Sequence, residues 1–234
     1  MKTLIFDVGG VLVYPRLGEW HIPYRAAEIL GPERARDMQT EAFRRAHTAC
    51  MPWLNEGRVV MDLETERLLR RGFVMDLGRA MGWRLTDAEI AALTDDFTDD
   101  IDRYGFFDDV KTWLERWSHS YTLGVLSDAM PSILMFLDQY GIAPYFKSAV
   151  ISTHVGATKP DPRMYAATLR ELGHVNPADC VFVDDRLVNI QGARAAGMKV
   201  VQMSRPEFPA EALWDGPVAH DFAELDRILR EETL

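Results

Sequence analysis

The sequence predicts an α/β fold, a doubly wound parallel sheet with an all-helical domain inserted after its first strand. Short apolar runs without polar alternation predict strands that are covered on both faces. Helical patterns between the later runs predict strand–helix–strand units with right-handed crossovers. A long stretch behind the first run shows helical patterns alone, and it predicts the inserted domain.

Apolar runs mark the predicted strands, and the first of them, Leu4–Phe6, leads directly into Asp7 and two glycines. The other runs are Leu123–Leu126, Cys180–Val183, Lys199–Met203 and the weaker Ala149–Ile151. A strand buried on both faces needs no polar side, so continuous runs of this length favour a parallel sheet. Polar residues follow three of the runs, where Asp7, Ser127 and Asp184 end the apolar pattern.

Helical patterns separate the later runs. The segment Pro131–Tyr140 carries its apolar residues on one stripe, and Gly141 follows it as a stop signal. Two further segments end in the same way, and these are Pro162–Leu172 before Gly173 and Leu187–Ala196 before Gly197. Strand and helix therefore alternate from about residue 107 onward, which is typical of a doubly wound sheet.

The first strand does not follow this rhythm. About 120 residues separate Asp7 from Ser127, whereas a strand–helix–strand unit takes about 30. Within the surplus, Thr86–Glu89 forms a capping box that predicts a helix through to Ile101, and Glu64–Met81 has helical apolar spacing. We therefore expect an α/β core from residues 1–16 and 105–234, with a helical cap from residues 17–104 over the carboxyl edge of the sheet.

Composition excludes several classes of protein. The net charge is −10, from 26 basic and 36 acidic residues, which argues against nucleic acid as a partner because such binding needs a basic face. The apolar runs fall far short of the ~18 residues that a membrane span needs, and the N-terminus turns acidic too early for a signal peptide. Two scattered cysteines, Cys50 and Cys180, predict no disulfide framework. We expect a cytoplasmic protein without a membrane partner.

The chemistry of this chain is expected at the carboxyl ends of the strands, where open α/β sheets bind ligands. Asp7, Ser127 and the pair Asp184–Asp185 follow strands, and Lys159 lies in a loop just before a helix. Three carboxylates in one cleft repel each other unless a cation lies among them, and carboxylate oxygens suit Mg²⁺. The ion would also neutralise a phosphate, so the expected reaction class is phosphoryl transfer.

Four segments in this order resemble the motifs of the haloacid dehalogenase (HAD) superfamily of phosphohydrolases. They are Phe6–Leu12, Leu126–Asp128, Lys159–Pro162 and Phe182–Asp185 with Asn189. The resemblance covers nearly the whole chain, and the predicted insert lies where the family has its helical C1 cap. The segment Trp53–Val59 is also similar to a cap segment of the branch near the epoxide hydrolase N-terminal phosphatase domain.

The resemblance implies a role for each motif residue in the hydrolysis of a small phosphorylated molecule. Asp7 would be the nucleophile that forms an aspartyl phosphate, and Lys159 would hold the phosphate and balance the charge of Asp7. The implied phosphate-binding residues are Val8, Gly9, Ser127, Asp128 and Lys159. The implied Mg²⁺ ligands are Asp7, the Gly9 carbonyl, Asp184 and Asp185. Asp185 would bind the ion through water, or it would orient Lys159 instead.

The first motif departs from the family pattern at Gly9, where most of these phosphatases have a second aspartate that serves as general acid and base. Such help contributes about 10²–10⁴-fold in rate. Another group, such as His21 or His47 of the cap, or a water could supply the proton. Alternatively, the substrate could have a leaving group that needs little protonation. As a third interpretation, the protein is a catalytically silent phosphate-binding or interaction protein.

Dehalogenation is a further alternative, in which Asp7 would attack carbon without a metal. The family branch that performs it has tyrosine at the position of Gly9 and lacks the acidic pair Asp184–Asp185. The acidic pair therefore favours phosphoryl transfer over a 2-haloacid dehalogenase.

Overall fold

The computed structural model describes residues 2–54 and 58–231. It divides into two compact units. The first unit takes residues 1–14 and 106–234, and the second takes Pro15–Gly105. The cap resemblance of Trp53–Val59 overlaps residues 55–57, which lie outside the described residues. Among the described helices, none has the length and apolar character needed to cross a membrane.

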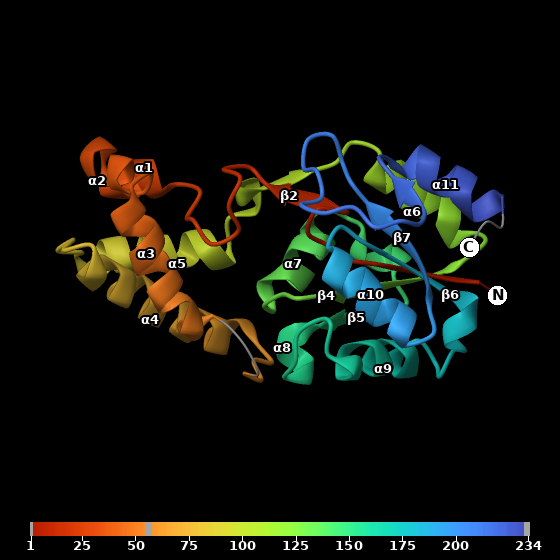
Figure 1. Ribbon diagram of the computed structural model, residues 1–234. Helices are drawn as coiled ribbons and strands as arrows, with labels where there is room; N and C mark the ends of the chain where they lie inside the picture. The colour runs from red at the N-terminus through yellow and green to blue at the C-terminus, as the bar shows by residue number, and fades with distance from the viewer. Residues whose placement is uncertain (1, 55–57, 232–234) are drawn as a thin grey trace. The chain divides into compact units, whose positions relative to one another are not determined.

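The first unit contains a six-stranded parallel sheet, as the sequence predicts (Figure 1). Its strand order is β5 (Ser148–Ile151), β4 (Thr122–Ser127), β1 (Thr3–Phe6), β6 (Cys180–Asp184), β7 (Lys199–Met203) and β8 (Val218–Ala219). The predicted strands β1, β4, β5, β6 and β7 are confirmed. The strand β8 has only two residues, so its sequence carries no apolar run that could predict it.

Helices cover both faces of this sheet, which confirms the doubly wound architecture (Figure 1). Phe6 on β1 packs against Trp117 and Phe222, with ring centroids 5.8 and 5.7 Å apart, respectively. Its neighbour Ile5 belongs to the opposite core, with Tyr165 and Ile190. These contacts place α6 (Val110–Ser118) and α11 (Phe222–Arg230) on one face, and α9 (Pro162–Glu171) and α10 (Leu187–Ala195) on the other. The remaining helices of this unit are α7 (Ser132–Gln139), α8 (Ser152–Val155) and the short 3₁₀ turns Ala143–Tyr145 and Pro177–Asp179.

The second unit is helical, as predicted for the insert. Its elements are α1 (Ala26–Leu30), α2 (Pro32–Asp37), α3 (Glu41–Cys50), α4 (Leu63–Ala80), α5 (Asp87–Thr98) and the 3₁₀ turns Met51–Trp53 and Ile101–Arg103. The capping box is confirmed, because Glu89 N donates to Thr86 Oγ1 and Thr86 N donates to Glu89 Oε2. The helix that it opens ends at Thr98, however, and not at Ile101, because the backbone is extended at Asp100, before the second of these 3₁₀ turns.

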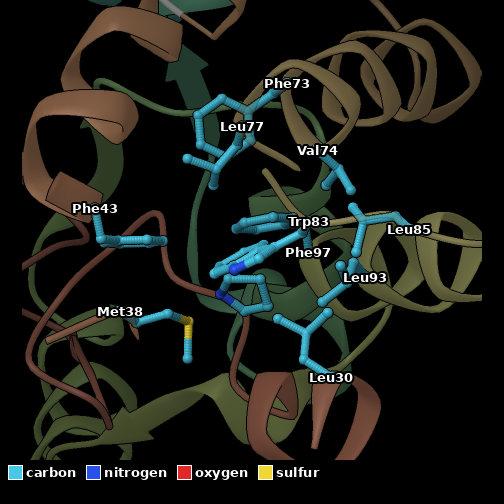
Figure 2. Close-up of a pocket in the computed structure, with 11 residues that line it drawn as sticks. Leu30, Met38, Phe43, Phe73, Val74, Leu77, Trp83, Leu85, Leu93 and Phe97 are labelled. Carbon is cyan, nitrogen blue, oxygen red and sulfur yellow. The ribbon is translucent and has the colours of Figure 1, made fainter. Parts of the chain in front are cut away.

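An apolar core holds these helices together (Figure 2). Side chains such as Phe43 of α3, Phe73 of α4 and Phe97 of α5 converge there. The gap among them leaves a volume of about 10 Å³ for the centre of a water-sized sphere, which is about what a single water molecule needs. It is therefore a packing gap and not a ligand pocket.

The chain passes between the units through two short strands that the sequence did not predict. They are β2 (Val13–Pro15) and β3 (Tyr104–Phe106), and they pair with each other as a separate two-stranded sheet. Between them, the described residues 16–54 and 58–103 contain no strand. An extended segment of three residues has too little pattern to distinguish a strand from a loop.

Candidate active site

The register of the sheet brings the polar ends of three strands to one edge. Phe6 of β1 is the neighbour of Val125 on β4 and of Val183 on β6. The next residues along these strands therefore lie at the same edge. Asp7 donates its main-chain N–H to the Val183 carbonyl at 2.9 Å, which fixes the start of the loop after β1 beside β6.

Three carboxylates meet at this edge. One oxygen each from Asp7, Asp184 and Asp185 lies within 4.8 Å of the others. Asp184 is fully buried, and Asp7 has a relative exposure of 7%. Carboxylates at this separation and burial repel each other strongly unless a positive charge lies between them.

Lys159 supplies one such charge. Its Nζ lies 2.7 Å from Asp184 Oδ2 and 3.0 Å from Asp7 Oδ1, and it donates to the Leu126 carbonyl at 3.2 Å. The ammonium is buried, and its loop is held because Lys159 N donates to Asp128 Oδ1 at 2.9 Å. Asp128 therefore supports Lys159 through its side chain, a contact that the sequence did not predict.

Asp184 is oriented by donors from the helix that follows it. Arg186 N donates to Asp184 Oδ1 at 2.8 Å, and Asn189 Nδ2 lies 3.0 and 3.1 Å from the two carboxylate oxygens. Asn189 lies in the first turn of α10. These donors fix the plane of the carboxylate, as outer-sphere partners do at metal sites.

The titration behaviour of the cluster reflects its burial. Burial raises the pKa of Asp184 to about 6. The charge of Lys159 lowers this pKa, and repulsion from Asp7 raises it. Burial, followed by repulsion from Asp7 and Asp184, raises the pKa of Asp185 to about 8. Burial opposes the charged form of Lys159 too, but Asp184 and Asp7 outweigh it, and the pKa of its ammonium lies above the ordinary value.

The cluster fits a divalent cation. One ammonium balances one of the three carboxylates, so the fully ionised site retains an excess of negative charge. Asp7 Oδ1 is buried and, within the part of the chain that the structure describes, accepts no aligned hydrogen bond, although Lys159 Nζ is near. A hard cation with oxygen ligands would satisfy that atom and lower the repulsion.

The turn after Asp7 brings the backbone close to this cluster. Leu12 N and Val13 N both donate to the Val8 carbonyl, and Gly10 N donates to the Val13 carbonyl. Gly10 has a φ of +68°, and a Cβ atom there would lie 2.6 Å from Asp185 Oδ2. Glycine is therefore required at this position by both conformation and space.

The structure brings together Asp7, Lys159, Asp184, Asp185 and Asp128, all of which the sequence singled out. Among the other candidates, Val8 and Gly9 form the turn just described, and Ser127 is buried at the end of β4. Gln202, whose Nε2 donates to the Asp185 carbonyl, is not among the residues that the sequence predicts for the site. A polar amide inside the apolar run of β7 was the signal that could have found it.

The two histidines considered as proton donors belong to the helical unit. His47 Nε2 lies 3.2 Å from the His21 carbonyl. Burial, with the charges of Arg70, His47 and Arg103, lowers the pKa of His21 to about 3. His21 is therefore uncharged near neutral pH and is a poor general acid there.

The sheet topology, the edge cluster and the motif order define a class of hydrolase. The family model of the haloacid dehalogenase-like hydrolases matches residues 1–197. The chain therefore belongs to this family, and the expected superfamily is confirmed. The L-2-haloacid dehalogenase of Xanthobacter autotrophicus has the same fold, with a TM-score of 0.69 and 20% identity over 98% of both chains.

Curated relatives are similar over shorter stretches. The glyceraldehyde 3-phosphate phosphatase of Methanopyrus kandleri is 40% identical over 73 residues, which is 31% of each chain. The fructose-1-phosphate phosphatase YqaB of Escherichia coli is 32% identical over 105 residues, which is 45% of this chain and 54% of that protein. The matched regions thus span about a third to a half of the length of these relatives.

Proposed function

We propose that this chain is an Mg²⁺-dependent phosphohydrolase that acts on a small phosphorylated molecule through an aspartyl phosphate on Asp7. The observation that carries the proposal is the buried cluster in which Lys159 Nζ lies 3.0 Å from Asp7 and 2.7 Å from Asp184. The relatives named as sugar-phosphate phosphatases support the same substrate class. The net charge of −10 remains an argument against nucleic acid.

In the proposed reaction, a carboxylate oxygen of Asp7 attacks phosphorus, and the bond from phosphorus to the leaving oxygen breaks. The leaving oxygen departs as an anion, and water supplies its proton. A water then attacks the phosphorus of the aspartyl phosphate, which releases inorganic phosphate and restores the Asp7 carboxylate. Lys159 remains charged throughout and holds a phosphate oxygen.

Backbone groups complete the proposed phosphate site. The N–H groups of Val8, Gly9 and Asp128 would donate to phosphate oxygens, and the Ser127 hydroxyl would add one hydrogen bond. The ion would be held by Asp7, the Gly9 carbonyl, Asp184 and Asp185. When bound, Mg²⁺ supplies positive charge that stabilises the transferring phosphoryl group.

Gly9 narrows the proposed substrate class. With no side chain at the position of the second acid, the leaving oxygen has no carboxyl donor from this turn. An acyl or aryl phosphate leaves as a stable anion and needs little protonation, whereas an alkyl phosphate leaves as a strongly basic alkoxide. We therefore infer that this chain prefers activated phosphate esters or anhydrides, unlike the relatives that are named for alkyl (sugar) phosphates.

Gly9 also supports a second candidate function, a catalytically silent phosphate-binding or interaction protein. In that case the Asp7–Lys159 cluster would bind phosphate without turnover. Dehalogenation is less well supported, because a metal-free attack on carbon has no use for the pair Asp184–Asp185. The structural likeness to dehalogenases concerns the fold alone.

A single-turnover experiment separates the first two candidates. The protein is mixed with Mg²⁺ and a ³²P-labelled aryl phosphate, quenched in acid, and digested to find label on the peptide that contains Asp7. We expect acid-stable, hydroxylamine-sensitive label that Asp7→Asn abolishes. Absence of both label and phosphate release, with phosphate still bound, would favour the silent protein.

A further inference from the structure

Gln202 is a fully buried amide in the sheet beside the acidic pair. It lies on β7 with no exposed surface. Its register partner on β6 is Asp184, and its partner on β8 is Val218. A buried amide destabilises a fold unless its polar atoms find partners, so the contacts of Gln202 indicate what it is there to hold.

Each polar atom of the Gln202 amide has a partner. Nε2 donates to the Asp185 carbonyl at 2.8 Å and to the Ala212 carbonyl at 2.7 Å. Oε1 accepts from Trp214 N at 3.0 Å. Two carbonyls on one side and one N–H on the other fix the orientation of the amide.

The contact with Asp185 bears on the carboxylate cluster. Asp184 already has side-chain anchors in Arg186 N and Asn189. The main chain of Asp185 is instead anchored by Gln202, while its carboxylate lies where a Cβ atom on Gly10 would be only 2.6 Å from Oδ2. A small rotation of the main chain at Asp185 would move this carboxylate into Gly10 or away from Asp7.

We propose that Gln202 is a positioning residue for the metal site. This inference rests on the function proposed above. By holding the Asp185 carbonyl, Gln202 keeps the Asp185 carboxylate within reach of Asp7 and Asp184. By holding Ala212 and Trp214, it ties the loop that follows β7 to the same point. Outer-sphere partners of this kind typically contribute 10–100-fold to metal affinity.

The test measures Mg²⁺ binding to the full chain by isothermal titration calorimetry, without substrate. Gln202→Met keeps the volume and removes both N–H donors, and we expect 10–100-fold weaker Mg²⁺ binding. Gln202→Asn keeps the amide but shortens the side chain by one methylene, so the amide cannot reach the same partners. It should also weaken Mg²⁺ binding. It retains hydrogen-bonding capacity and provides the test if the methionine variant does not fold.

Thr168→Val is the matched control. Thr168 is also fully buried in the first unit, and its Oγ1 donates to the Met164 carbonyl at 3.0 Å. The control should lower the thermal midpoint without changing Mg²⁺ affinity, which is what a merely structural role for Gln202 would also produce. Weaker Mg²⁺ binding in the folded Gln202 variants alone supports the inference.

Two different failures are distinguishable. If the natural protein binds Mg²⁺ and a folded Gln202 variant binds it equally well, Gln202 is not a positioning residue, although the proposed function stands. If the natural protein itself binds no Mg²⁺, the proposed metal-dependent function fails, and the inference fails with it.

Discussion

Replacement of Lys159 by methionine tests the electrostatics of the cluster directly. The side chain is buried, and its ammonium lies within 3.0 Å of Asp7 and 2.7 Å of Asp184. Methionine has a similar length and keeps contact with apolar neighbours such as Phe182, whose ring centroid lies 5.5 Å from Nζ. The substitution therefore removes the charge with little change in volume.

The structure bounds the size of the effect. At an effective dielectric constant of 20, opposite charges 4 Å apart attract by about 4 kcal/mol. The desolvation of buried ions offsets several kcal/mol of such attraction, and removal of one partner of a buried pair typically costs about 3–5 kcal/mol. We expect Lys159→Met to lower the free energy of unfolding by about this amount near pH 8 in the absence of metal.

The loss of unfolding free energy in Lys159→Met should depend on pH. The pKa of Asp184 is raised in the folded state, to about 6, so its stabilising contribution is present below its unfolded pKa and is lost as the pH rises through the folded pKa. Lys159 opposes that shift, and its removal raises the pKa of Asp184 further. The variant therefore takes up a proton on acidification, and its stability deficit should shrink toward pH 5.

The measurement is urea denaturation of both proteins near pH 8 and pH 5 with EDTA present. Lys147→Met is the control, because the Lys147 ammonium donates to the Leu172 carbonyl at 2.8 Å and does not belong to the carboxylate cluster. The loss of unfolding free energy in Lys147→Met should be small and nearly independent of pH. An unchanged unfolding free energy in Lys159→Met near pH 8, or a deficit that does not vary with pH, would mean that Lys159 does not neutralise the carboxylate cluster.

Three further predictions concern the metal and the turn after Asp7. Asp184→Asn should abolish Mg²⁺ binding by calorimetry, and unchanged affinity would mean that the ion binds elsewhere. Gly10→Ala should lower stability by about 1–2 kcal/mol because of its left-handed backbone, measured as a shift in urea midpoint. It should also weaken Mg²⁺ binding, whereas Gly141→Ala, with a φ of +69° but no close carboxylate, should lower stability alone. The natural protein should show kcat/KM values that fall steeply with rising leaving-group pKa over a series of phosphate esters. Gly9→Asp should flatten that dependence, and a flat dependence in the natural protein would mean that another group already donates the proton.

The architecture and most residues of the candidate site can be predicted from the sequence alone. Buried parallel strands need continuous apolar runs, so β1, β4, β6 and β7 are visible without a structure. The polar residues that end those runs must lie at one edge of the sheet, because parallel strands point the same way. This local rule alone predicts that Asp7, Ser127 and Asp184 lie close together.

The helical insert was visible for a related reason. Helix signals are local, and the capping box at Thr86–Glu89 is a contact between residues three apart. The predicted end of that helix lies three residues beyond the observed one, because Ile101 keeps helical spacing from Phe97 although the backbone is extended at Asp100. The strands β2, β3 and β8 cannot be predicted from the sequence. A segment of two or three residues becomes a strand only by pairing with a neighbouring strand, and it is too short to show an apolar pattern of its own.

The contacts between individual polar groups depend on the tertiary structure. The approach of Lys159 to both Asp7 and Asp184 depends on a loop that reaches the edge from the far side of β4. The contacts of Asp128 with Lys159 and of Gln202 with Asp185 join segments that are 31 and 17 residues apart in the chain. A hydrogen bond between such segments leaves no periodic pattern in the sequence, because its geometry is fixed by strand order and by the packing of the loops between the strands.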